Sequence, residues 1–174
     1  ANAFRVWPGK VAYVPQSVEL YGGTIAENVA LGFKSKEINI DQVFRALEIS
    51  KLGEFCRALP QGIHTQIFDR GRNFSGGQRQ RIGVARALYT SPAVIFLDEA
   101  TSSLDAETED LLSKSLQVLR GETTFIVIAH RLSTVRSADL VIYMESGRIV
   151  KSGTFDEVRK SVPNFDHQAK LMGI

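Results

Sequence analysis

The sequence predicts an α/β fold in which a mostly parallel sheet is flanked by helices. Three short apolar runs, at residues 11–14, 93–97 and 125–129, are rich in β-branched or aromatic side chains. Continuous rather than alternating runs favour strands that are covered on both faces, as in parallel sheets. A long stretch with helical features separates the first two runs, and 44% apolar residues allow an ordinary core.

That long stretch, residues 24–92, is predicted to be largely helical. Thr24 and Glu27 fit a capping box, in which each side chain satisfies the other residue's backbone amide. Asp41 has the side chain of an N-cap and precedes a helical pattern over residues 42–49. We therefore expect a helical subdomain inserted into the sheet core.

After this subdomain the pattern is strand, helix, strand. Leucines that recur at helical spacing after Asp105 predict an amphipathic helix. Residues 140–144 lead through a Glu-Ser-Gly turn to a returning strand at residues 148–151, which is typical of a β-hairpin. Thr154 then forms a second capping-box pattern with Glu157.

Charge, cysteine content and apolar run length exclude several classes of protein. The 21 basic and 19 acidic residues give a net charge of +2, which offers no electrostatic reason to expect nucleic acid as a partner. Cys56 is the single cysteine, so no internal disulfide forms and a reducing compartment is favoured. The longest fully apolar runs have five residues, whereas a membrane-spanning helix needs ~20.

Polar residues follow three of the predicted strands. Gln16, the pair Asp98 and Glu99, and His130 stand where those strands end, and ligands of open α/β sheets gather at the carboxyl ends of the strands. An Asp-Glu pair there is expected when one carboxylate holds magnesium and the next orients a water molecule. A strand-terminating turn and a structural histidine are the alternatives, and Gln16 alone carries no signal.

Ser75, Gly76 and Gly77 stand directly before a helical run. Glycines let a backbone approach a ligand closely, and the free amides at a helix start attract anions. This pattern is compatible with a phosphate site, and a plain surface turn is the other interpretation.

In their order along the chain, these motifs resemble the nucleotide-binding domain of the ATP-binding cassette (ABC) family, over nearly the whole sequence. The matching elements are Val14-Pro15-Gln16 (Q-loop), Phe74-Ser75-Gly76-Gly77-Gln78 (signature motif, with Phe74 where leucine is usual), residues 94–99 (Walker B with its catalytic glutamate), residues 102–105 (D-loop) and His130 (switch histidine). The resemblance implies an ABC-type P-loop NTPase core with an α-helical subdomain. The implied domains are 1–16 (core strand and Q-loop), 17–92 (helical subdomain) and 93–174 (C-terminal part of the core).

The resemblance also implies roles, with ATP and Mg²⁺ as cofactors. Gln16 and Asp98 would help to hold Mg²⁺. Glu99 would polarise the attacking water, and His130 would contact the γ-phosphate. These are the residues expected to serve a nucleotide on their own domain.

Other residues are expected to act between domains. The resemblance implies that Ser75, Gly76, Gly77 and Gln78 bind the ATP held by a second nucleotide-binding domain, and that Asp105 links the two sites. Residues 17–28 would face the coupling helices of a transmembrane domain. The implied function is ATP-driven transport, with this domain at the cytoplasmic face of a membrane.

The family's phosphate loop, Gly-x-x-x-x-Gly-Lys-[Ser/Thr] (Walker A), does not occur in the sequence, because Gly9-Lys10 is followed by Val11. We therefore expect the C-terminal part of a cassette, without the N-terminal strands, that is not competent for ATP hydrolysis alone. Sheet edges left uncovered would lower its stability and favour self-association.

The sequence signals for a particular branch of the family are less specific than those for the family. Residues 23–28 and Asp69-Arg70-Gly71 resemble exporter segments. An importer cassette, a chromosome-maintenance or DNA-repair ATPase, and a non-catalytic fragment that supplies only a signature face to a partner's ATP site are the alternatives.

Overall fold

A computed structural model describes residues 9–100, 104–128 and 135–171. The chain separates into two compact units, Ala1–Ile128 and Ala129–Ile174, and each unit is considered by itself. The three domain ranges expected from the sequence stay a prediction. Within the described residues no helix combines the length and apolar character that a bilayer span needs.

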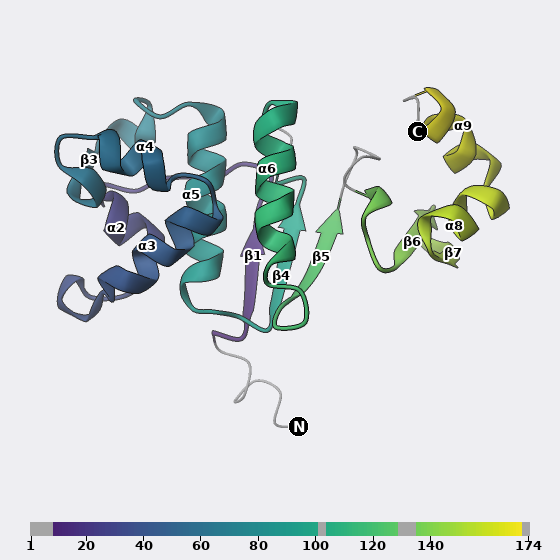
Figure 1. The fold of residues 1–174 in the computed structure, drawn as a ribbon, viewed down its shortest axis with the longest axis horizontal. Coiled ribbons are helices and arrows are strands. Elements are labelled where there is room, and N and C mark those ends of the chain that lie inside the picture. The colour runs from purple at the N-terminus through teal and green to yellow at the C-terminus, as the bar shows by residue number, and fades with distance from the viewer. Residues whose placement is uncertain (1–8, 101–103, 129–134, 172–174) are drawn as a thin grey trace. The chain divides into compact units, whose positions relative to one another are not determined.

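The first unit is built on a three-stranded parallel sheet in the order β1-β4-β5 (Figure 1). Its strands are β1 (Val11–Val14), β4 (Val94–Asp98) and β5 (Thr124–Ile128). All three coincide with the predicted apolar runs to within one residue, and both pairings are parallel. The predicted fold class is confirmed.

One face of this sheet is well covered and the other is not. Val14, Ile95 and Leu97 are almost completely buried, whereas Tyr13 and Ile128 are 58% and 52% exposed. The expectation that the strands are covered on both faces is therefore wrong for the described part of the chain. Side chains alternate between faces along a strand, so an apolar run alone cannot show which face is packed.

The helices of the subdomain lie beside β1, on the side that faces away from β4 (Figure 1). They are α2 (Ile25–Val29), α3 (Ile40–Ile49), α4 (Gly53–Ala58) and α5 (Gly76–Tyr89), with short 3₁₀ turns at Ser35–Glu37, Gly62–His64 and Asp69–Gly71. The predicted Thr24–Glu27 capping box is confirmed, since Thr24 Oγ1 accepts from the Glu27 amide at 3.1 Å and the Thr24 amide donates to Glu27 Oε2 at 2.8 Å.

Two local predictions in this subdomain need correction. Asn39, not Asp41, is the N-cap of α3, because its Oδ1 accepts from the Gln42 amide at 3.1 Å and its backbone is extended. Asp41 lies in the first turn instead. A two-residue antiparallel ladder between β2 (Gly23–Thr24) and β3 (Gln66–Ile67) also interrupts the helices; strands this short carry no periodic pattern.

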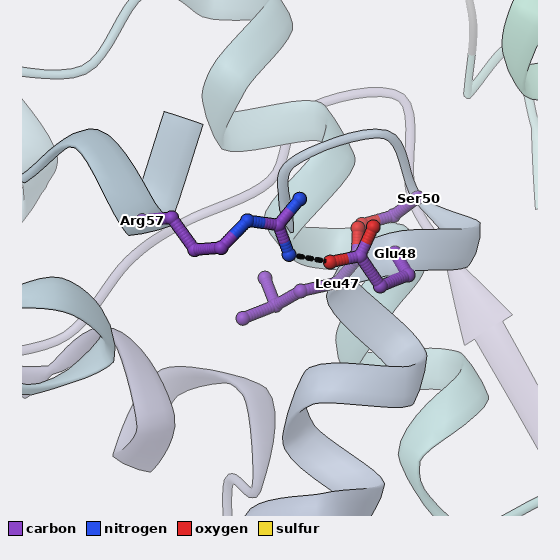
Figure 2. A network of polar contacts seen from close by, with 4 residues as sticks. All are labelled: Leu47, Glu48, Ser50 and Arg57. Carbon is purple, nitrogen blue, oxygen red and sulfur yellow. Dashed lines mark hydrogen bonds and ion pairs between the residues drawn. The ribbon is translucent and has the colours of Figure 1, made fainter. Parts of the chain in front are cut away.

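The turn between α3 and α4 is closed by polar contacts (Figure 2). Arg57 forms an ion pair with Glu48, and Ser50 Oγ donates to the Leu47 carbonyl at 3.1 Å. Both charged side chains are about half exposed, and such pairs contribute little to stability. The tight packing comes from Leu47 and Leu52, both fully buried in the core that α3 shares with α5.

The second unit is a hairpin with two helices packed on it. Strands β6 (Val141–Glu145) and β7 (Arg148–Gly153) are antiparallel, as predicted. Ser146 and Gly147 both have positive φ, the conformation of tight hairpin turns. Helices α8 (Phe155–Ser161) and α9 (Pro163–Leu171) follow, and the Thr154–Glu157 capping box is confirmed.

Candidate functional site

Three of the predicted site residues meet at the carboxyl edge of the sheet. Val14 pairs with Leu97, so the residues that follow β1 and β4 emerge side by side. Gln16 Nε2 donates to Glu99 Oε2 at 2.7 Å, which joins two residues that are 83 positions apart. Asp98 is the last residue of β4. His130, the fourth predicted residue of this edge, lies outside the described residues.

Glu99 has an unusual backbone. Its φ is 48°, in the left-handed region, which costs a non-glycine residue about 1 to 3 kcal/mol. The Glu99 amide donates to the Ile128 carbonyl at the end of β5, at 3.0 Å. This bond to a neighbouring strand holds the strained residue, and with it the direction in which the carboxylate leaves the sheet. Strain of this kind is common at functional sites.

The predicted phosphate-facing segment is a capped helix start. Ser75 is the N-cap of α5, and its Oγ accepts from the Gln78 amide at 3.2 Å. The Ser75 amide in turn donates to Gln78 Oε1 at 2.8 Å. Gly76 and Gly77 occupy the first two helical positions, where amides have no acceptor within the helix. Ser75 is exposed, so this end of α5 is open to a ligand.

Phe74 departs from the usual leucine of the signature motif, and the structure explains how it fits. Its side chain is only 4% exposed. It packs edge-on against Phe55 of α4, with ring centroids 6.0 Å apart. Arg79 Nη1 donates to the Phe74 carbonyl at 2.6 Å. The larger ring thus lies between α4 and the start of α5, and leaves the Ser75 cap intact.

Gln80 connects the signature helix, which is α5 with its Ser75 cap, to the loop that carries Gln16. The sequence alone did not identify Gln80 as a site residue. Its side chain is 2% exposed, and Nε2 donates to the Pro15 carbonyl at 3.0 Å. Because Pro15 immediately precedes Gln16, this bond connects the two parts of the site. The sequence signal that could have identified Gln80 is its spacing, because a glutamine four residues before Val84 lies on an otherwise apolar helix face.

Replacing Gln80 with leucine is expected to lower the free energy of unfolding of the chain by about 1 to 3 kcal/mol. Leucine has a similar size but cannot donate to the Pro15 carbonyl, which is then left without this partner in a partly buried position. Urea unfolding measures the change. Gln42→Leu on the exposed side of α3 is the control, and a loss no larger than in this control would contradict the role of the Gln80 bond.

Arg86, in the last turn of α5, is hydrogen-bonded to residues 17–28, the segment predicted to face a transmembrane domain. Nε donates to the Asn28 carbonyl at 2.8 Å and Nη2 donates to the Glu19 carbonyl at 3.2 Å. The guanidinium also lies 5.8 Å from the centre of the Tyr21 ring. Burial lowers the pKa of Arg86. The segment and the signature helix are therefore held together as one body.

Asp105 is exposed and caps α6 (Ala106–Gln117). Its Oδ1 accepts from the Thr108 amide at 2.9 Å and its Oδ2 from Thr108 Oγ1 at 2.8 Å. These bonds, and to a lesser degree the charge of Arg81, lower the pKa of Asp105. A carboxylate held by two hydrogen bonds thus stands on the surface at the start of α6.

The donors at the sheet edge fit a magnesium ion that is completed by other ligands. Gln16 offers an amide oxygen and Asp98 a carboxylate, and both are oxygen donors of the kind that Mg²⁺ prefers. No cluster of three or more His, Cys, Asp or Glu that could hold a metal occurs among the residues that the structure describes.

A helical subdomain inserted into a parallel sheet, with a capped glycine pair and strand-end carboxylates, is the arrangement expected from the sequence for a nucleotide-binding α/β protein. Residues 2–102 match the family model described as ABC transporter. The chain belongs to the ABC transporter family, which confirms the resemblance seen in the sequence.

Individual relatives are similar over most of this chain. It is 43% identical to an "ATP-dependent lipid A-core flippase" of Cupriavidus pinatubonensis, over 90% of this chain and 27% of that protein. It is also 43% identical to the "ABC-type transmembrane transporter verA" of Clonostachys rogersoniana, over 90% of this chain and 12% of that protein. The chain therefore spans about a quarter or less of these relatives.

A solved structure agrees with the fold. A bacterial Atm1-family ABC exporter with ATP bound superposes with a TM-score of 0.86 and 30% identity, over 95% of this chain and 29% of that one. The roles of the individual site residues stay predictions.

Proposed function

We propose that this chain is part of a nucleotide-binding domain that binds and hydrolyses ATP to drive an exporter-type ABC transporter. The observation that carries the proposal is the meeting of Gln16, Asp98 and Glu99 at one sheet edge, with the signature helix bonded to the same loop through Gln80. The relatives named as a flippase and as an ATP-bound exporter support it.

In the proposed reaction Glu99 acts as the general base. Its carboxylate takes a proton from a water molecule whose oxygen attacks the γ-phosphorus of ATP. The bond from that phosphorus to the bridging oxygen breaks, and ADP leaves with the bonding electrons. Gln16 holds the Glu99 carboxylate in place before attack. His130 is proposed to contact the γ-phosphate.

Gln16 and Asp98 are proposed to hold Mg²⁺, which supplies positive charge to the phosphates. Phosphoryl transfer depends mainly on positioning and on such charge neutralisation. The oxygen donors of the two side chains suit this role.

The signature segment is proposed to serve a second nucleotide-binding domain. The first-turn amides of Gly76 and Gly77, with Ser75 and Gln78 at the same helix end, would receive the γ-phosphate of ATP bound by the partner. Asp105 would link the two sites. Closure of the pair would move a transmembrane domain through residues 17–28, which Arg86 attaches to the signature helix. The domain would lie at the cytoplasmic face of the membrane.

The test is ATP turnover by the full-length protein that carries Gly77→Asp. An acid in the first helical turn favours the helix through its dipole, whereas its charge repels a phosphate. Turnover is expected to fall roughly 100-fold or more. Gln42→Asp, which adds the same charge to the first turn of α3, is expected to leave turnover unchanged. Equal turnover in both variants would refute the proposal for the signature helix.

A further inference from the structure

Resting on the proposed function, we propose that Tyr13 is a positioning residue for Asp98. Its hydroxyl donates to Asp98 Oδ2 at 2.7 Å. The bond fixes the carboxylate in one orientation before Mg²⁺ and nucleotide arrive, and it occupies only one of the two carboxylate oxygens.

The sheet register places the two residues for this contact. Tyr13 on β1 pairs with Phe96 on β4, and Asp98 follows Phe96 by two positions on the same strand. Side chains two residues apart point to the same face, and a diagonal neighbour is within reach of an aromatic side chain. The Tyr13 ring therefore extends along the sheet toward the carboxyl edge, where its hydroxyl meets Asp98.

Within the part of the chain that the structure describes, packing alone does not account for a tyrosine at this position. Its side chain is 58% exposed, whereas the neighbouring Val14 on the opposite face is fully buried. The polar end of Tyr13 is the part that makes a specific contact.

The adjacent carboxylates thus have separate donors. Gln16 donates to Glu99 and Tyr13 donates to Asp98, both at 2.7 Å. Hydrogen bonds to an ionised acceptor are about twice as strong as neutral ones. Each donor comes from β1 or the loop after it, and each acceptor from the end of β4. Strand β1 and the loop that follows it therefore orient both acids, and this separates the proposed metal-holding role from the proposed general-base role.

The experiment measures ATP affinity of the full-length protein in the Glu99→Gln background, with Mg²⁺ and with chelator. Tyr13→Phe is expected to leave the metal-free affinity unchanged and to reduce the Mg²⁺-dependent gain in affinity by roughly 3- to 10-fold. Tyr143→Phe, the same change in β6, is the matched control. In an Asp98→Asn background, Tyr13→Phe is expected to have no further effect, because the residue acts through Asp98.

The outcomes separate the two proposals. If the parent protein gains no ATP affinity from Mg²⁺, the proposed function itself is wrong. If the parent does gain affinity and Tyr13→Phe keeps or increases that gain, only the role of Tyr13 is overturned. An equal loss of affinity with and without Mg²⁺ would assign Tyr13 a structural role, and would overturn it too.

Discussion

Replacing Glu99 with glutamine in the full-length protein is expected to lower ATP turnover by about 10²- to 10⁴-fold. Glutamine has the same size, and its amide can still contact the Gln16 side chain, which lies 2.7 Å from the Glu99 carboxylate. It cannot accept the proton of the attacking water. The proposed general base is lost while the geometry of the sheet edge is kept.

ATP binding is therefore expected to survive in the Glu99→Gln variant, and steady-state turnover with a parallel binding measurement would show the difference. Glu54→Gln on the exposed side of α4 is the matched control, and it is expected to retain full turnover. Wild-type turnover in Glu99→Gln would refute the assignment of Glu99 as the base. A loss of binding as large as the loss of turnover would mean that the side chain supports the fold or the nucleotide instead.

Gly71→Ala is expected to lower the free energy of unfolding by about 2 to 4 kcal/mol. Gly71 has a φ of 75°, and a Cβ there would lie 2.7 Å from Leu20 Cδ1. Leu20 is 1% exposed, so it cannot move aside without disturbing the core. Asp69 and Arg70 also have positive φ, and the three residues form the tight turn that leads into Phe74 and the signature helix.

Gly121→Ala separates the two causes of the lost stability, which are backbone strain and the overlap with Leu20. Gly121 has a φ of 89°, but a Cβ at that position meets nothing within 4 Å. Its replacement should show the backbone strain alone, about 1 to 2 kcal/mol. Urea unfolding of both variants measures the difference, which reports the overlap with Leu20. Equal losses in the two variants would show that Leu20 adapts freely.

Much of the fold could be predicted because its signals are local. The apolar runs predicted β1, β4 and β5, and the Ser/Thr-x-x-Glu pattern predicted the caps at Thr24 and Thr154. The exact residue at which a helix starts has a weaker local signal. Asp41 and Asn39 both have capping side chains, and Asn39 is the cap because its backbone is extended and its side chain reaches the Gln42 amide. The local sequence pattern does not contain that backbone geometry.

The candidate site also contains residues that the sequence could predict and residues that it could not. The order of motifs along the chain identified the family, and Gln16, Asp98 and Glu99 could be chosen because they follow predicted strands. Gln80 and Tyr13 could not be chosen. Their partners, the Pro15 carbonyl and Asp98, lie 65 and 85 positions away, and a glutamine in a helix or a tyrosine in a strand is unremarkable without them.

The amino-acid sequence by itself determined the element types, the family and the chemical groups at the strand ends, since these depend on residue type and on spacing along the chain. Only the tertiary structure decided which of those groups meet. The parallel register of β1 and β4 brings Tyr13 to Asp98 and Gln16 to Glu99, and the packing of α5 brings Gln80 to the loop between them. Distance in space, unlike spacing in the chain, is decided by how the elements pack.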